Sequence, residues 1–282
     1  MHKLLCAYFT RLKKDKALWL FAAGMFLMSA AVMLSGLRLH MKYPDDAAFA
    51  ALEYYLFQSM PFIGVFASVT VGFFLGKEYG YGTLRNKLVT GHTRGRIYLA
   101  SLAAAVAAAE IVAVGWLLGG LTGIPYFGLW TMETEQFLLF LLLTVLATAA
   151  LAALFHLIGM LVSSQSVSVV AAMFASLGLL MLGSFLYNQL CEPETTYDHI
   201  VITAQGLQLG DEVPNPAYVG GALRSVYYVL LNILPTGQGI LMANADDGAV
   251  VLNPALGAAG SVLIILGAAA LGLLLFRKKD LK

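Results

Sequence analysis

The sequence predicts an all-α membrane protein with six transmembrane helices. Apolar residues make up 60% of the 282-residue chain and charged residues only 12%, and the mean hydropathy of +0.80 is far above that of a soluble domain. Crossing about 30 Å of hydrocarbon takes about 20 apolar residues, because a helix rises about 1.5 Å per residue. The stretches that meet this length are 17–37, 56–76, 97–121, 137–162, 167–187 and 255–276. The first is longer than the apolar region of a signal peptide, so we expect an uncleaved anchor.

The positions of the cations predict the orientation of these spans. Short cytoplasmic loops retain Lys and Arg, and six spans place both termini on the same side of the membrane. With the termini inside, fourteen of the seventeen cations are cytoplasmic: Lys3, Arg11, Lys13, Lys14, Lys16, Lys77, Arg85, Lys87, Arg94, Arg96, Arg277, Lys278, Lys279 and Lys282. The expected location is therefore the cell membrane, with a multi-pass chain and both termini cytoplasmic.

Acidic residues show the opposite bias. The orientation places twelve of them outside: Asp45, Asp46, Glu53, Glu133, Glu135, Glu192, Glu194, Asp198, Asp211, Glu212, Asp246 and Asp247. The net charge of +1 hides this split. Because topology and contact with membrane lipid headgroups explain the basic clusters, they give no reason to expect a nucleic-acid partner.

The stretch 217–234 is apolar enough to suggest a seventh span, but two observations oppose it. Arg224 would lie near the middle of the bilayer at a high free-energy cost, and an odd number of spans would place the basic C-terminal tail outside. Two alternatives stay open. The stretch can dip into the outer leaflet, stop at Pro235 and Gly237 and return over 239–243 as a re-entrant segment, or it can lie on the surface as an amphipathic helix.

We expect one transmembrane domain over residues 1–282, with three segments outside the spans. Residues 1–16 form an amphipathic helix on the inner membrane surface, because its apolar side chains fall in one arc: Leu4, Leu5, Tyr8, Phe9 and Leu12. Residues 77–96 form a cytoplasmic loop, and residues 188–254 form a long, acidic outer segment.

Motifs of catalysis and of nucleotide binding are missing from the sequence. Residues 72–77 superficially resemble a phosphate-binding loop, but the stretch is one residue short, and Glu78 stands where Ser or Thr must hold magnesium. No HExxH, paired CxxC or GxSxG motif occurs, and the five histidines are scattered. We therefore expect no cofactor in this chain.

Glu110 is the strongest candidate for a functional residue within a predicted span, because an ionised carboxylate there has a high free-energy cost. It either marks a substrate or proton path together with His156, or it is a neutral side chain hydrogen-bonded to a neighbouring helix, which is the more common role. Helix geometry places the two residues about 10 Å apart in depth, which argues against a direct pair. Gly115, Gly119 and Gly123 recur every four residues and predict close helix packing.

The loop at 76–96 is a charged, glycine-punctuated interruption between two apolar runs. Gly80 and Gly82 are expected to end the preceding helix, Thr83 to cap a new one and Gly91 to end it after about seven residues, or about 11 Å. Leu84 and Leu88 form an apolar pair at i, i+4, and Arg85 and Lys87 project to other sides. Such a helix suits insertion into a cleft on a partner protein, although a polar loop whose cations serve topology is equally compatible with the pattern.

These residues resemble the first cytoplasmic loop of type-2 ABC transporter permeases, in which the pattern E-x-x-x-G-T-hydrophobic-R leads into a coupling helix. The matching positions are Glu78, Gly82, Thr83, Leu84, Arg85, Gly91, Arg94 and Arg96. The string GTLRNKLVTGHTRGRIYL is similar to permeases of bacterial exporters of the bacitracin, lantibiotic-immunity and sodium-export kind. LPTGQ at 234–238 and the basic tail at 276–282 add to the likeness.

The resemblance implies a permease subunit whose coupling helix is moved by a separate ATPase subunit, which binds ATP and Mg. It also implies a second permease chain, identical or different, to complete the path. The residues that it assigns to ATPase coupling are Glu78, Gly82, Thr83, Leu84, Arg85, Lys87 and Leu88. Among them, Leu84, Arg85 and Leu88 are expected to touch the ATPase, and Glu78 to act as an orienting salt-bridge or capping residue.

Two other classes of function stay open. An ion-coupled carrier or intramembrane enzyme centred on Glu110 would need no ATPase partner. A membrane sensor without transport would use a partner at 77–96 but give no ATP-dependent flux. A neighbouring reading frame that encodes a P-loop ATPase would favour the exporter.

Overall fold

The computed structural model describes residues 2–43, 51–203, 206–245 and 248–279. The chain is mainly helical, with six helices or helix series long and apolar enough to cross a membrane. These are α2 (Lys16–Lys42), the series α3 (Leu52–Gln58), η2 (Met60–Phe62) and α4 (Ile63–Gly80), the series α6 (Arg94–Gly120), η3 (Leu121–Gly123) and α7 (Ile124–Phe127), then α8 (Thr134–Leu161), α9 (Gln165–Cys191) and α12 (Pro254–Lys278). These six helices and helix series cover the six predicted stretches, with only Val162 lying one residue beyond α8. The predicted outer residues Asp45, Asp46, Asp246 and Asp247, and Lys282 of the tail, lie outside the described residues.

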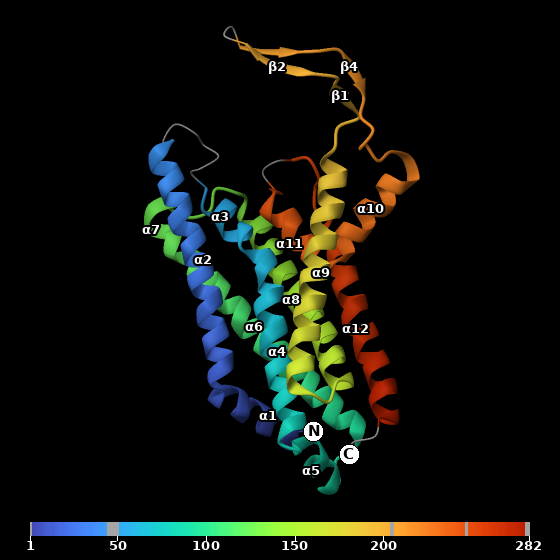
Figure 1. Cartoon of the computed structure of the whole chain (residues 1–282). Helices are drawn as coiled ribbons and strands as arrows, with labels where there is room; N and C mark the ends of the chain where they lie inside the picture. Colours follow the sequence, from blue (N-terminus) through green and yellow to red (C-terminus); the bar gives the residue numbers. More distant parts are fainter. Residues whose placement is uncertain (1, 44–50, 204–205, 246–247, 280–282) are drawn as a thin grey trace.

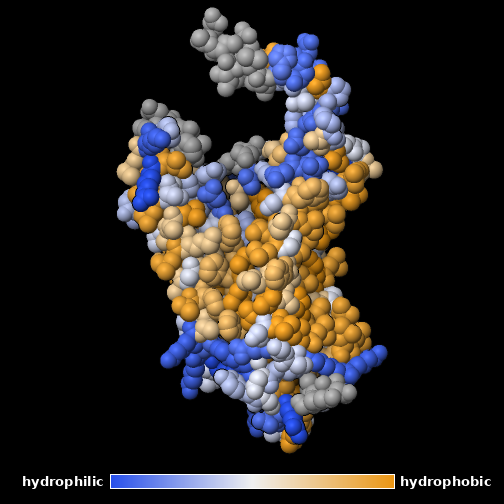
Figure 2. All heavy atoms as spheres, viewed as in Figure 1, coloured by the Kyte–Doolittle hydropathy of each residue, from blue (hydrophilic) through white to orange (hydrophobic). Residues whose placement is uncertain are grey.

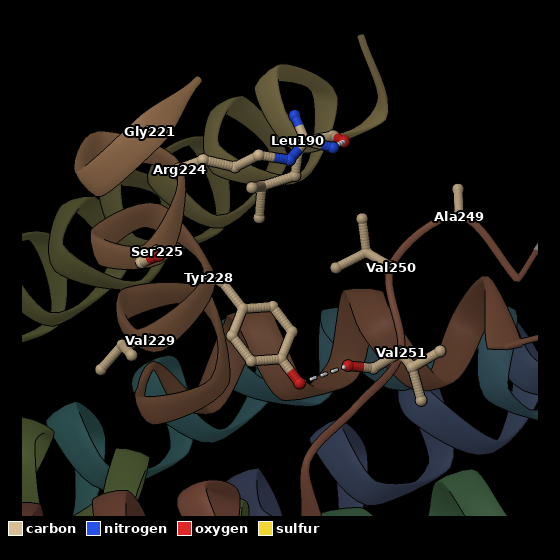
Figure 3. A pocket seen from close by; sticks show the side chains of 9 residues that line it. All are labelled: Leu190, Gly221, Arg224, Ser225, Tyr228, Val229, Ala249, Val250 and Val251. Carbon is tan, nitrogen blue, oxygen red and sulfur yellow. Dashed lines mark hydrogen bonds between the residues drawn. The ribbon is translucent and has the colours of Figure 1, made fainter. Parts of the chain in front are cut away.

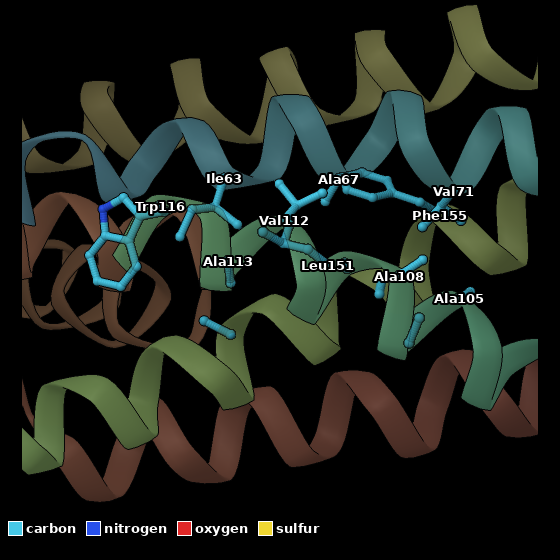
Figure 4. Close-up of a cluster of buried hydrophobic side chains, with 14 of the residues drawn as sticks. Ile63, Ala67, Val71, Ala105, Ala108, Val112, Ala113, Trp116, Leu151 and Phe155 are labelled. Atoms are coloured by element: carbon cyan, nitrogen blue, oxygen red, sulfur yellow. The ribbon is translucent and has the colours of Figure 1, made fainter. Parts of the chain in front are cut away.

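The helices form an elongated bundle (Figure 1). The spans that contain α4, α6 and α8 have the largest shares of buried residues, and α2, α9 and α12 have the smallest. Small, branched and aromatic side chains of the three central helices fill the core, among them Ala67, Val112 and Phe155 (Figure 4). Apolar side chains also cover the sides of the bundle, and hydrophilic ones gather at its two ends (Figure 2). This surface is typical of a protein surrounded by lipid along its middle.

The predicted close packing at the glycines of α6 is confirmed. A Cβ atom at Gly115 would lie 2.4 Å from the backbone oxygen of Ala22, and one at Gly119 would lie 2.3 Å from that of Phe26. Gly123 continues the same row against Met33. Because real Cβ atoms do not approach so closely, glycine allows the backbones of α2 and α6 to touch.

Both termini lie at one end of the bundle, which we call the terminal end (Figure 1). Here α1 (His2–Lys14) crosses beneath the long helices and buries one apolar face, which consists of Leu4, Tyr8 and Leu12. Three of the five residues of the predicted arc are thus buried, whereas Phe9 is 42% exposed.

The opposite end, which we call the distal end, holds a bent pair of helices, α10 (Gly221–Ile233) and α11 (Pro235–Ala243), which meet at 96°. Pro235 begins α11, and residues 235–242 are all buried between the long helices. The LPTGQ stretch lies at this bend: Thr236 donates to the backbone oxygen of Leu179 at 2.8 Å, and Gln238 donates to that of Gly257 at 3.0 Å. The motif therefore pins α11 to α9 and α12.

The fold is all-α, as expected, and the distal end adds four short strands to it. Two antiparallel pairs extend the segment beyond α9: β1 (Thr195–Tyr197) with β4 (Glu212–Pro214), and β2 (Ile200–Thr203) with β3 (Gly206–Leu209). They project away from the bundle (Figure 1). The sequence here is rich in β-branched residues, which favour strands, and the segment at 188–254 therefore contains strands as well as the expected helices.

Candidate functional site

The predicted short helix of the 77–96 loop is present at the tip of the terminal end as α5 (Thr83–Val89; Figure 1). The chain reverses at Gly82 and Gly91, whose φ angles of 63° and 88° lie in the left-handed region that glycine adopts without strain. The predicted cap at Thr83 is wrong. Gly82 occupies the N-cap position, and the Thr83 hydroxyl instead donates to the backbone oxygen of Glu78 at 3.0 Å.

A buried ion cluster fixes α5 to the bundle. The side chain of Glu78, in the last turn of α4, is fully buried and accepts from Arg11 of α1 and from Lys87 of α5, the latter at 2.5 Å. The ammonium of Lys87 also lies 3.7 Å from the centre of the Tyr8 ring. Three elements separated in sequence therefore converge on one carboxylate, and of the two roles expected for Glu78 the structure contains the salt bridge.

The surroundings of this cluster favour a fixed arrangement. Burial lowers the pKa of the Lys87 ammonium, and the Glu78 carboxylate opposes part of that shift. Burial and the same carboxylate raise the pKa of the Tyr8 phenol, which stays neutral. A second pair, between Lys77 and Asp15 at 2.7 Å, joins α4 to the turn between α1 and α2. A buried charge that lost its partner would be costly, so the elements are held together as a unit.

The orientation of α5 corrects the predicted contacts. Leu84 is only 2% exposed and belongs to the hydrophobic core, and Leu88 is half-buried against the same core. The apolar ridge of this helix therefore faces its own chain. A seven-residue helix cannot stay folded in water without such burial, because it is too short to be stable alone.

The free surface at the tip consists of other side chains. Tyr81 is 73% exposed and Val89 is 79% exposed, and Arg85 between them is also exposed. We call these three residues the tip face. Arg85 and Val89 are four residues apart in α5 and therefore lie on one side of that helix, whereas Tyr81 precedes the turn at Gly82. The i, i+4 spacing of Arg85 and Val89 could have indicated their shared side from the sequence, but Leu84 and Leu88 have the same spacing.

A shallow cavity of about 330 Å³ lies beside α5, between it and α1. Its lining includes Leu4 and Ala7 of α1, Asn86 and Lys87 of α5, and Thr90 directly after α5. Both helices therefore contribute to the wall of this cavity.

The end of the chain is tied to the same region. Arg94, at the start of α6, donates to the backbone oxygens of Phe276 and Arg277, each at 3.1 Å. Lys279 donates to the Tyr79 hydroxyl and to the backbone oxygen of Met160, each at 2.9 Å, and burial lowers the pKa of its ammonium. The basic residues of the loop and the tail therefore also brace the terminal end.

The two polar residues predicted within the spans lie apart from each other in separate surroundings. His156 is fully buried in α8 and shares a hydrogen bond of 2.8 Å with the hydroxyl of Ser101 on α6. Glu110 is half-buried in α6, and its Oε1 atom has no hydrogen-bond partner among the described residues. The expectation that the two do not pair is confirmed, but the expected hydrogen bond from Oε1 of Glu110 to a neighbouring helix is not found.

Comparisons with known proteins identify no family: no protein-family model matches the chain, and a search of curated proteins finds no match. The assignment of a function therefore depends on the sequence pattern at the tip and on the contacts described above.

Proposed function

We propose that this chain is the membrane-spanning permease subunit of an ATP-driven exporter of the type-2 ABC class. A separate ATPase subunit would bind ATP and Mg and contact the tip face. The observation that carries the proposal is the structure of α5: a short helix with an exposed face, held to the bundle by the buried Glu78 cluster. A topological loop needs neither the buried ion cluster nor the ordered helix.

The geometry supports a transmission of force from the tip to the spans. Lys87 moves with α5, whereas Glu78 belongs to α4 and Arg11 to α1. A displacement of α5 by the ATPase would therefore displace α4 and α1 with it. Because the Asp15–Lys77 pair also joins α4 to the turn between α1 and α2, tilting of these helices is the expected response to ATP binding in the partner.

We assign the terminal end to the cytoplasm. The described part of that end contains thirteen of the fourteen cations that the orientation places inside, and the short loops of the cytoplasmic side retain Lys and Arg. The bent pair of α10 and α11 then forms a re-entrant segment at the outer side, where protein surrounds the returning helix.

The transport path would be completed by a second permease chain. On the outer half of this chain, a cavity of about 400 Å³ lies between α3, α9 and α11. Gln58, Ser184 and Asn244 line it together with Phe62 and Leu180, and it has no charged side chain among its lining residues. Uncharged polar groups beside apolar ones suit the passage of an amphipathic compound.

One observation favours a second candidate. The unpartnered carboxylate oxygen of Glu110 lies within a span, where such groups serve ion-coupled carriers and intramembrane enzymes. An activity that needs Glu110 and an ion gradient, but no ATPase, would identify this class instead. A membrane sensor would bind a partner at the tip face without ATP-dependent flux.

The proposal is tested by photo-crosslinking from the tip face in native membranes. A photoreactive amino acid at Val89 should crosslink to a P-loop ATPase, whereas the same group at Val251, which is 68% exposed at the distal end, should not. Reconstitution with that ATPase should then give ATP-dependent export. Crosslinks from Val89 to lipid alone would refute the assignment.

A further inference from the structure

The distal end contains a mainly apolar cavity that is lined by one cationic side chain, Arg224. It has a volume of about 380 Å³ and lies between the end of α9, the first turns of α10 and the loop at 249–251. Apolar side chains form most of its wall, including Leu190, Val229 and Val250, and Arg224 extends along one side toward the end of α9 (Figure 3).

The guanidinium of Arg224 has N–H groups that are free to donate to a ligand. One donates to the backbone oxygen of Leu190 at 2.6 Å and another to that of Val219 at 3.4 Å, which leaves three of its five N–H groups without a partner among the described residues. The ring of Tyr218 lies 5.1 Å from the guanidinium carbon. Two backbone oxygens therefore hold one edge of the guanidinium in place, and its other edge is free to bind a ligand.

No carboxylate of the described residues pairs with Arg224, although this end of the chain is acidic. Glu192, which directly follows α9, instead accepts from the side-chain amide of Asn215 at 3.0 Å. Asp198 pairs with His199 in the projecting strands. A half-buried cation in an apolar wall without a counter-charge favours an anion as its ligand, and a guanidinium matches the oxygens of a phosphate in pairs.

An apolar track begins at the same cavity. Leu223, Val226, Val229 and Leu230 of α10 are between 38% and 50% exposed. Their spacing places them along one side of the helix. Val229 both belongs to this track and lines the cavity, so the anion-binding group and the apolar surface are continuous.

We propose that this cavity binds an anionic phospholipid, with the phosphate at Arg224 and the acyl chains along the exposed side of α10. The charge selects an anionic ligand, and the apolar track selects one with acyl chains over a free anion. The hydroxyl group of Ser225, which lines the cavity, is available as a further donor to the headgroup. This inference needs no ATPase partner and stands independently of the exporter proposal.

Native mass spectrometry of the purified full-length chain tests the site with two lipids that share the same acyl chains. Phosphatidylglycerol should bind at one site per chain more tightly than phosphatidylcholine, and Arg224→Gln should weaken that binding by about tenfold, as expected for the loss of one charge-assisted contact. Arg38→Gln is the matched control, because Arg38 is an exposed cation at the distal end of α2. It should leave the affinity unchanged.

A second variant keeps Arg224 and fills the cavity. Ala249 is exposed at the rim, so Ala249→Trp should fold normally and weaken phosphatidylglycerol binding as well. Equal binding of the two lipids, or unchanged binding in both cavity variants, would overturn the proposal. Full displacement of the lipid by an equal concentration of inorganic phosphate would also overturn it, because the site would then bind a free anion.

Discussion

Glu78 and Lys87 form an ion pair of 2.5 Å in which the carboxylate is completely buried, across the glycine turn that separates α4 from α5. Arg11 occupies the other oxygen of the same carboxylate. The turn contains the left-handed Gly82 and would otherwise be a hinge. The ion pair closes that hinge, so the tip of the terminal end moves as one body with α4 and α1.

Replacing Glu78 should therefore release the tip. Glu78→Gln leaves two cations around a neutral amide, and breaking a buried pair in this way costs about 3–5 kcal/mol when both charges are buried. The cost is smaller here, because the side chain of Arg11 is 28% exposed. We expect faster amide hydrogen exchange in α5 and α1 and unchanged exchange in α8.

A double-mutant cycle isolates the pair itself. Lys87→Met and Glu78→Gln should each destabilise the fold, and together they should cost less than the sum of the single variants. Additive effects in thermal unfolding would contradict a direct interaction.

Two substitutions on the same short helix should have opposite outcomes. Leu84→Asp would place a carboxylate in the core, and the free-energy cost of burying that charge should prevent α5 from packing. Val89→Asp places the new carboxylate at an exposed position, where water solvates it. We expect a large loss of monodisperse protein for Leu84→Asp and wild-type yield for Val89→Asp in size-exclusion chromatography. Equal yields would mean that α5 is packed in another orientation.

The sequence was sufficient to place α5 but not to orient it. Glycines at 80, 82 and 91 set its ends, because chain reversal there depends on local backbone preference. Which side faces inward depends on α4 and α6, which pack against α5, and on Glu78 of α4 and Tyr8 of α1, which contact Lys87. Two rows of side chains at the same spacing, one with Leu84 and Leu88 and one with Arg85 and Val89, cannot be separated by periodicity alone.

In other parts of the chain, too, local sequence predicts where the helices lie but not which distant residues they contact. The six spans follow from hydropathy, since each apolar run must be long enough to cross a bilayer. The pairing of Glu78 with Arg11 joins positions 67 residues apart, and no local pattern specifies such a contact. The strands at 195–214 were missed because each is only three or four residues long.

The contact between α2 and α6 gives a further prediction. Gly115→Ala places a Cβ atom against the backbone of Ala22 and should lower the melting temperature in detergent by several degrees. Gly178→Ala is the matched control, because no atom lies within 4 Å of the added carbon and alanine favours the helix. A similar melting temperature for both variants would show that the two helices are not closely packed.

Glu110→Gln separates the two transport classes. The exporter proposal places the energy source in a partner, so the neutral amide should preserve ATP-dependent flux in vesicles. Loss of all flux, together with dependence on an ion gradient in the wild-type protein, would favour the ion-coupled carrier.

Charge reversal at Arg85 tests whether the tip face binds the ATPase. Arg85 and Lys14 are both exposed cations at the terminal end, one on the tip face and one on α1. The measurement is the amount of P-loop ATPase that co-purifies with each variant from native membranes. We predict that Arg85→Glu loses the ATPase while Lys14→Glu retains it, with both chains folded. If no P-loop ATPase co-purifies with the wild-type protein, or if Arg85→Glu retains it in full, the tip face does not bind an ATPase.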